Sequence, residues 1–270
     1  MVFVGSEPWV VVQRFGRTSG SIEVRGPRGA TRGELAAPGW MAAAASGEGV
    51  LVAIAQSGPA AVRAAWFPAE DGRPLRPRLV SVPRVAGRDF APVGVSVTSR
   101  PGGFAILWQE GSTRDPNETW RTYEARLDGA GALIGAPRQL AQVPWPIADA
   151  AWVNGRYFLL LYYGTSAPSA RGSRPVHVND AGHPEEHPWW ATREGLIGEA
   201  RCVVAGERAL ALYRGGPDGG ELLEADVTTG AWAREVPSPT SHGRVAPEDA
   251  YGARHDGQLR IERVDLRALR

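Results

Sequence analysis

A short apolar run that ends in a polar or aromatic pair, with a glycine close behind, returns five times along the chain. The runs are Trp9–Gly16, Val50–Gly58, Phe104–Gly111, Phe158–Gly164 and Leu210–Gly215. Their spacing is about 50 residues. A fixed period of this size is typical of repeat architectures, in which each copy is one supersecondary unit. The repeat therefore constrains the possible folds more strongly than any single motif does.

Each repeat predicts four short strands. A small apolar segment precedes the run in four of the repeats: Ala42–Ala45, Val95–Thr98, Ala150–Val153 and Ala200–Val204. An alternating segment with a turn in it follows each run: Ser21–Leu35, Val62–Leu79, Thr119–Leu140, Val176–Trp189 and Glu221–Val236. No window shows a convincing helical period, and glycine and proline lie between the runs, where turns are expected. The pattern indicates antiparallel strands and almost no helix.

Units of four strands at this period predict an all-β fold, a β-propeller of four-stranded antiparallel blades in a single domain. We expect five blades, one of them shared by the two chain ends so that no sheet edge stays open. The expected blades span residues 249–270 with 1–40, then 41–93, 94–147, 148–198 and 199–248. Six blades are the alternative, because Val2–Val4 and Gln258–Leu266 compete for places in the shared blade.

The clearest repeat, Phe104–Leu133, contains the segment Tyr123–Asp128, which reads YEARLD. It resembles the repeats of bacterial β-propeller proteins, in which an apolar strand is followed by a segment of the form ARLD-x-x-G-x-L. The resemblance covers most of the chain and implies an architecture. Propellers host binding, lectin, hydrolase and scaffold roles, so the architecture alone does not select a function.

Charge and cysteine content exclude several classes of function. The chain has 30 Lys and Arg against 29 Asp and Glu, a net charge of +1, so we expect neither nucleic acid nor a membrane as a partner. No apolar run approaches the roughly 20 residues of a membrane span. Cys202 is the only cysteine, which rules out an intrachain disulfide and a multi-cysteine zinc site. The start of the chain shows no secretory signal, so a cytoplasmic protein and a mature exported one both fit.

Three carboxylates recur with the repeat. Asp149, Glu199 and Asp249 are 50 residues apart, and each comes directly before an alanine that opens a predicted first strand. The first strand of a blade starts near the propeller axis, so the three side chains would meet at the central mouth and act as catalytic candidates. Such a cluster could bind a cation, hydrogen-bond sugar hydroxyls or supply an acid and a base. The alternative is that short polar residues begin strands through local hydrogen bonds.

The ends of the second strands supply a second set of candidate residues, for ligand binding. They combine amides, arginines and aromatic rings, which together offer stacking surface and directional donors to a small polar ligand or glycan. The set is Gln13, Arg14, Gln56, Trp108, Gln109, Glu110, Tyr162, Tyr163, Tyr213 and Arg214. In any propeller these positions also lie where strands emerge into solvent.

These residues support two main hypotheses. The first is a ligand- or partner-binding propeller, lectin-like in taking a small polar ligand or glycan on its loop-rich face, or a protein partner. The second is a glycoside hydrolase or another tailoring enzyme that uses two of the three carboxylates, and five-bladed glycoside hydrolases look similar in placing three carboxylates at the axis. No cofactor is expected. His183 and His187 lie in a predicted turn, so they do not predict a metal site either.

Overall fold

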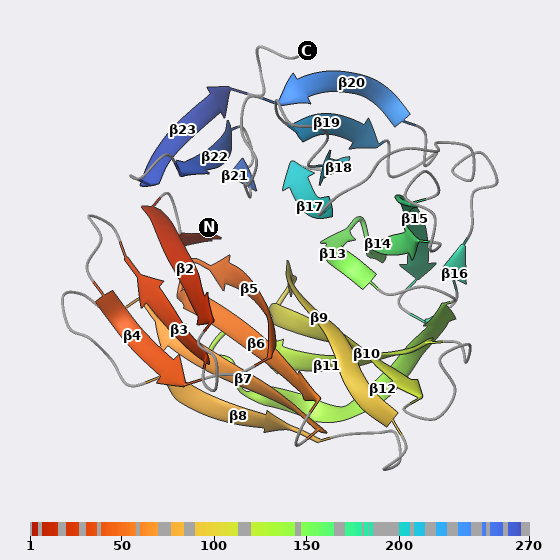
Figure 1. The fold of residues 1–270 in the computed structure, drawn as a ribbon. Coiled ribbons are helices and arrows are strands. Elements are labelled where there is room, and N and C mark those ends of the chain that lie inside the picture. Colours follow the sequence, from red (N-terminus) through yellow and green to blue (C-terminus); the bar gives the residue numbers. More distant parts are fainter. Residues whose placement is uncertain are drawn as a thin grey trace. The chain divides into compact units, whose positions relative to one another are not determined.

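The protein was analysed as a computed structural model (Figure 1). It describes residues 2–4, 7–15, 20–26, 31–36, 39–57, 60–69, 77–83, 90–112, 120–143, 147–164, 171–179, 181–182, 184–185, 200–205, 208–213, 220–225, 232–238, 245–246, 249–255 and 259–265. The chain divides into two compact units, Met1–Pro146 and Ile147–Arg270. Among the described residues, no helix is long and apolar enough to span a membrane.

The unit Met1–Pro146 contains three four-stranded antiparallel sheets. The first has β1 (Val2–Val4), β2 (Glu7–Phe15), β3 (Gly20–Arg25) and β4 (Thr31–Ala36). The second has β5 (Trp40–Ser46), β6 (Gly49–Ser57), β7 (Ala60–Pro68) and β8 (Arg78–Val82). The third has β9 (Phe90–Arg100), β10 (Gly103–Ser112), β11 (Trp120–Asp128) and β12 (Leu133–Val143). In each sheet the strands follow one another in chain order.

The unit Ile147–Arg270 repeats this pattern. One sheet has β13 (Ile147–Val153), β14 (Arg156–Gly164), β15 (Arg171–Asn179) and β16 (Pro184–Glu185). The next has β17 (Ala200–Ala205), β18 (Arg208–Tyr213), β19 (Gly220–Ala225) and β20 (Trp232–Ser238). The last has β21 (Val245–Ala246), β22 (Asp249–His255) and β23 (Leu259–Asp265). The predicted all-β, antiparallel, four-stranded organisation is confirmed.

The strand pairing gives six separate sheets among the described residues. β1 to β4 pair with one another at the start of the chain, and β21 to β23 pair with one another near its end. The number of blades around an axis, five with one blade shared by the chain ends or six, stays a prediction.

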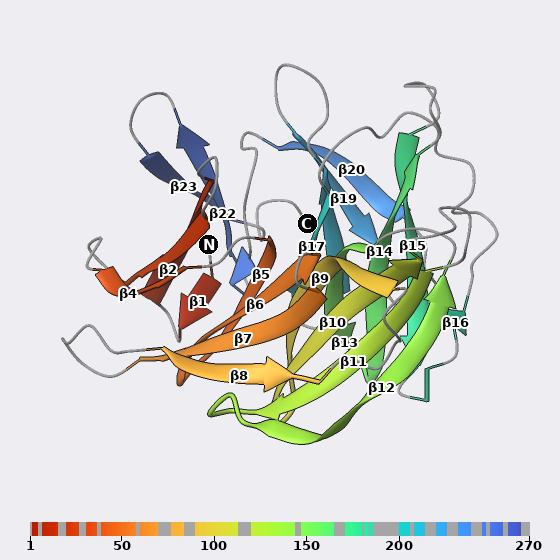
Figure 2. The ribbon, with the colours of Figure 1, turned by 60° about the horizontal axis from the view of Figure 1, so that its bottom comes forward.

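The sheet β5–β8 buries both of its faces within the first unit. Successive side chains of a strand point to opposite faces, and the alternate residues of β6 enter two different apolar clusters. Leu51 and Ala53 pack with β9–β11, including Phe104 and Trp108, whereas Val50, Val52 and Ile54 pack with β1–β3. This explains why Val50–Ala55 is apolar at every position. The ring centroids of Trp66 and Phe104 lie 5.5 Å apart between the second and third sheets. Figure 2 shows these two sheets face to face.

The inner strands of these sheets are neighbours. β5 lies beside β9, and β1 lies beside β5. Small side chains favour this arrangement: Ala42 and Ala44 of β5 are buried in the contact with the third sheet. The Oγ of Ser99 on β9 also donates a 2.7 Å hydrogen bond to the carbonyl oxygen of Ala45 on β5. The sequence expectation that small residues mark the first strand of each repeat therefore agrees with the packing in this unit.

Gly103 provides a test of the register between β10 and β11. Its φ is +148°, and a Cβ there would overlap the backbone carbonyl of Leu127 on β11. We expect Gly103→Ala to lower the free energy of unfolding by about 2–4 kcal/mol, because backbone cannot move aside as a flexible side chain can. Urea unfolding followed by circular dichroism measures the change.

The matched control is Gly47→Ala in the β5–β6 turn. A Cβ at Gly47 meets no heavy atom within 4 Å, so the free energy of unfolding should change by less than about 0.5 kcal/mol. Equal losses in the two variants would contradict the close pairing of Gly103 with β11.

Candidate functional site

Two of the predicted ligand-binding residues, Gln13 and Gln56, come together at the start of β5. Gln13 lies near the end of β2, and its Nε2 donates a 2.6 Å hydrogen bond to the carbonyl oxygen of Gly39. Gln56 lies near the end of β6, and its Cγ is 3.2 Å from the position that a Cβ of Gly39 would take. A side chain at Gly39 would also overlap the carbonyl of Ala55. The two amides thus lie beside one backbone segment, where close packing against β6 leaves room for glycine alone.

The same end of the next sheet interface carries Trp108 and Glu110. Trp108 is fully buried, and its ring stacks on Tyr123 with centroids 5.6 Å apart. Its Nε1 donates a 3.0 Å hydrogen bond to Oε1 of Glu110, which is also fully buried. The β9–β10 register shifts between Gln109 and Glu110, as at a β-bulge, and such bulges re-aim side chains next to functional sites.

These two pairs occupy equivalent places in the unit. Gln56 follows Val52 and Ile54 on the face of β6 that packs against the first sheet. Glu110 follows Ile106 and Trp108 on the face of β10 that packs against the second. Each apolar interface between sheets therefore ends in polar side chains at the end where the second strand finishes. Burial of a polar group is costly unless it is hydrogen-bonded, which explains the acceptors found for Gln13 and Trp108.

Most of the remaining predicted ligand-binding residues lie in second strands. Gln109 is buried, at 1% exposure. Arg14 lies in β2, Tyr162 and Tyr163 lie in β14, and Tyr213 ends β18, which agrees with the predicted second strands. Arg214 lies outside the described residues. The roles of all these residues as ligand contacts stay predictions.

Two of the three predicted carboxylates lie in strands that the structure describes. Asp149 lies in β13 at 1% exposure, and its Oδ1 accepts a 2.9 Å hydrogen bond from the backbone N–H of Ala150. A local hydrogen bond of this kind is what we expect if the acid helps to begin a strand and does not bind a ligand. Glu199 lies outside the described residues, and Asp249 begins β22. The described part of the chain holds no group of three His, Cys, Asp or Glu side chains arranged for a metal ion.

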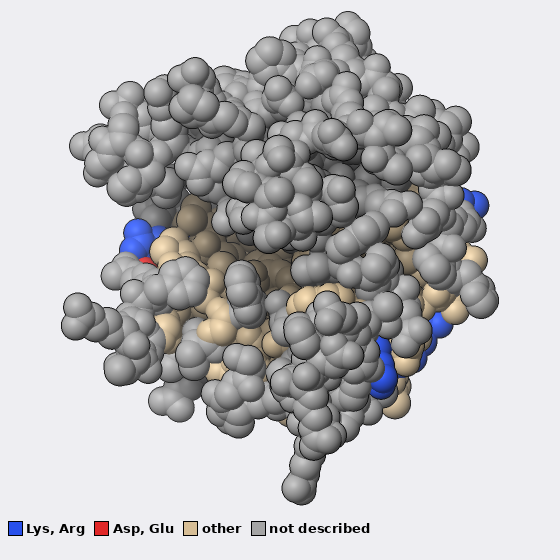
Figure 3. Space-filling view, turned by 45° about the vertical axis from the view of Figure 1, so that its right-hand side comes forward, with Lys and Arg blue, Asp and Glu red and all other residues tan. Residues whose placement is uncertain are grey.

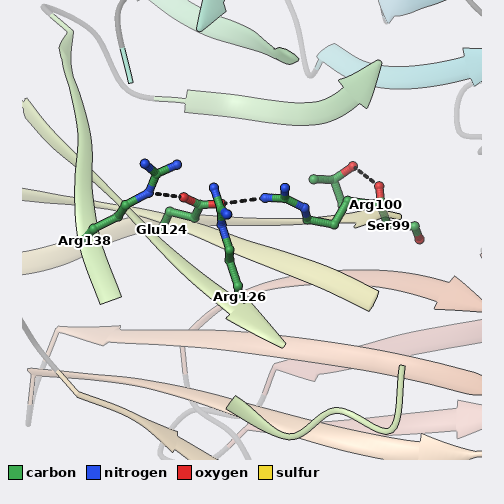
Figure 4. Close-up of polar contacts among 6 residues, drawn as sticks. Ser99, Arg100, Glu124, Arg126 and Arg138 are labelled. Carbon is green, nitrogen blue, oxygen red and sulfur yellow. Dashed lines mark hydrogen bonds and ion pairs between the residues drawn. The ribbon is translucent and has the colours of Figure 1, made fainter. Parts of the chain in front are cut away.

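Sequence reasoning missed a densely bonded charged group, which centres on Glu124 of β11 (Figure 4). Its Oε1 accepts hydrogen bonds from Nη1 of Arg100 at 2.9 Å and from Nε of Arg126 at 2.8 Å. Its Oε2 accepts a 2.6 Å hydrogen bond from Nε of Arg138. The arginines come from β9, β11 and β12, so one carboxylate connects three strands. We call these four residues the Glu124 cluster.

The Glu124 cluster lies on the face of its sheet opposite the apolar interface. Tyr123, Ala125 and Leu127 of β11 enter the interface, and Glu124 and Arg126 alternate with them. Arg138 is the register partner of Glu124 on β12. Arg100 is on β9, two strands away, and its side chain reaches Glu124 across β10 at Gly103 and Ala105, which are small. The sequence signal was present in the alternation Y-E-A-R-L, but the third and fourth members are too distant in sequence to be recognised from it.

Burial decreases from the carboxylate to the guanidiniums. The Glu124 side chain is 0% exposed, while those of Arg100, Arg126 and Arg138 are 13%, 33% and 39% exposed. All three guanidiniums donate to this one carboxylate. The chain has no lysine, so the blue groups that dominate the described charged surface in Figure 3 are arginines.

At another site, the hydrogen bond from Arg25 to Glu23, together with the Glu23 charge, raises the pKa of the Arg25 guanidinium.

We expect Glu124→Gln to be strongly destabilising. The amide keeps the shape of the side chain but removes the charge that neutralises the arginines. Removing one partner of a buried ion pair costs about 3–5 kcal/mol, and the partial exposure of Arg126 and Arg138 reduces this to about 2–3 kcal/mol. Chemical unfolding measures the loss. Glu7→Gln, at an exposed position of β2, is the control and should shift the free energy of unfolding by less than about 0.5 kcal/mol. Similar values for both would mean that the Glu124 cluster adds little to stability.

Comparisons with known proteins bear on the fold. No family model matches the sequence, and no curated protein matches it. Among solved structures, the chain is similar to an α-L-arabinofuranosidase from Clostridium thermocellum, with a TM-score of 0.51 and 10% identity over 85% of this chain and 93% of that one. It is also similar to the β-propeller domain of the Trilobed protease from Pyrococcus furiosus, with a TM-score of 0.52 and 9% identity over 98% of this chain and 79% of that one.

A third similar structure is TolB from Acinetobacter baumannii, with a TM-score of 0.51 and 11% identity over 95% of this chain and 60% of that chain. At such low identities the likeness concerns the fold and not the activity. The strand pairing and these three structures together assign the chain to the β-propeller architecture, with no closer family.

Proposed function

We propose that the chain is a binding propeller that holds a small polar ligand, with a glycan as the class that its residues suit best. The observation that carries this proposal is the meeting of Gln13 and Gln56 at the backbone of Gly39. Two amides from adjacent sheets offer both donors and acceptors in one place, which is the chemistry that sugar hydroxyls require. Gly39 lets the backbone between the two amides pack closely against β6.

The apolar interfaces behind these strand ends support the same proposal. Glu110 and Trp108 end the neighbouring interface, and Gln109 belongs to the same strand end. Binding sites in proteins of this kind combine a mostly apolar frame with a few fixed polar groups. The apolar interfaces supply that frame, because they pack β6 as far as Ile54 and β10 as far as Trp108.

The test is a glycan array followed by titration calorimetry of any glycan that binds. We expect a glycan to bind the wild type, and Gln56→Ala to weaken it at least about tenfold, the loss of about 1.4 kcal/mol that one or two hydrogen bonds represent. Gln139→Ala is the matched control, because Gln139 is an exposed glutamine on β12. It should bind as tightly as the wild type.

Two results would contradict the proposal. If no glycan binds the wild type, a glycan-binding role is wrong and a protein partner becomes the better hypothesis. If a glycan binds but Gln56→Ala and Gln139→Ala behave alike, the ligand lies elsewhere on the molecule.

The alternative, a glycoside hydrolase with axial carboxylates, has less support. Asp149, the member whose burial the structure describes, is buried and accepts a local hydrogen bond from the next backbone N–H. A panel of chromogenic glycosides separates the two functions. Turnover by the wild type that Asp149→Asn abolishes would favour the hydrolase, whereas binding without turnover favours the binding propeller.

A further inference from the structure

The strand β8 (Arg78–Val82) forms one edge of the sheet β5–β8. It pairs with β7 on one side, and no described strand pairs with it on the other. Figures 1 and 2 show β8 at the outer margin of its sheet. Every second residue of an edge strand turns its backbone N–H and C=O away from the sheet, where another extended chain can pair with them. β8 is therefore a place where a strand can be added.

The side chains of β8 divide between the core and the solvent. Val82 is buried and Val80 is partly buried, and both pack with the apolar cluster of the second and third sheets. Arg78, Leu79 and Ser81 are exposed. Leu79 is 63% exposed, the largest such fraction among the large apolar side chains that the structure describes. Covering it with an apolar side chain of a partner strand would remove this surface from water, which favours association.

Prolines limit the length of the available edge. Pro77 comes directly before β8, and Pro83 comes directly after it. Proline has no backbone N–H and cannot donate to an added strand. The edge therefore suits a short extended segment that pairs with the five residues between the prolines.

The charge of this sheet selects the partner. Its four strands contain two charged residues, the exposed Arg63 on β7 and the exposed Arg78 on β8, and no acidic one. Arg63 is the register partner of Ser81, so its side chain lies on a face that an added strand would share. The acid Glu48 lies in the β5–β6 turn, away from the edge. Residues 72–88, which include β8, contain five arginines and no acidic residue.

An added strand with acidic side chains would thus meet opposite charge along its length. A second copy of the chain, pairing edge to edge, would bring arginines toward arginines instead. Juxtaposed like charges disfavour a wrong partner, whereas complementary charges speed and direct the encounter with the right one. The charge pattern therefore favours an acidic partner over self-association.

We propose that β8 receives an extended, acidic segment of a protein partner as a fifth strand of the sheet β5–β8. Backbone hydrogen bonds along the edge supply affinity, and side chains at alternate positions supply specificity, as in other cases of strand addition. Leu79 takes an apolar side chain, and Arg63 and Arg78 attract acidic ones. This surface shares no residue with the glycan site proposed above, so each proposal can fail without the other.

The first probe is a fluorescein-labelled peptide of alternating valine and glutamate, about seven residues long so that it spans the edge. It is titrated with the full chain and followed by fluorescence anisotropy. A peptide of alternating valine and lysine has the same length and apolar content and is the charge control. We expect saturable binding of the glutamate peptide, at least about tenfold tighter than that of the lysine peptide.

A second peptide tests whether the backbone takes part. In a depsipeptide with the same side chains as the glutamate peptide, ester oxygens replace the backbone N–H groups. Charge and shape are kept, but the donors that pair with an edge strand are lost. We expect the depsipeptide to bind at least about tenfold more weakly than the glutamate peptide.

Variants of the protein localise the contact. Leu79→Asp should weaken binding of the glutamate peptide at least about tenfold, because it removes the apolar contact and adds a like charge. Ile134→Asp is the matched control, since Ile134 is also a large apolar residue, 53% exposed, on the outer strand β12 of the third sheet. It should bind like the wild type. Arg78→Glu is the second variant and keeps the test decisive if Leu79→Asp fails to fold.

Four outcomes would overturn the proposal. The first is no saturable binding of the glutamate peptide, or equal binding of the lysine peptide. The second is equal binding of the depsipeptide, which would mean attraction between side chains without strand addition. The third is an equal loss of binding in Leu79→Asp and Ile134→Asp. The fourth is a dimer of the wild type in sedimentation that Leu79→Asp dissociates, which would assign the edge to a second copy of the chain.

Discussion

The first unit depends on one requirement, that the sheet β5–β8 cover both of its faces with apolar side chains from its two neighbours. The requirement acts on β6 most directly, since Leu51 and Ala53 face one neighbour while Val52 and Ile54 face the other. A sheet with one wet face could keep polar residues at every second position, but this one cannot. The small residues of β5 and the large rings of Trp66 and Phe104 follow from the same requirement, because they fill the narrow and wide parts of an interface.

Two sets of polar groups in the described sheets differ in kind. Gln13 and Gln56 lie at strand ends, whereas the members of the Glu124 cluster are bonded to one another. The two solutions have different consequences. An amide at a strand end can exchange a protein partner for a ligand at small cost. A carboxylate that holds three strands together cannot be given up, so any binding there must add to its bonds without replacing them.

The sequence was sufficient to predict the strands, their antiparallel pairing and their grouping in fours, because each of these properties leaves a local and periodic trace. Ala42–Ala45 and Val95–Thr98 lie within first strands, as expected. What could not be predicted depends on contacts between distant positions. Trp108 was expected to offer a stacking surface to a ligand, yet it is fully buried against Tyr123. Arg100 and Arg138 meet Glu124 only because of the β9–β12 register, which no local pattern specifies.

In the hydrogen bonds between sheets, the donor and the acceptor restrict the sequence to different extents. Ser99 and Gln13 each donate from a side chain, but their acceptors are the backbone carbonyls of Ala45 and Gly39. A backbone acceptor is present whatever residue occupies its position. Each link therefore restricts the identity of its donor alone, and the acceptor position is free to change as far as space allows. Propellers joined in this way can lose nearly all recognisable sequence similarity while their blades stay connected, which accords with the 9–11% identity to structures of the same architecture.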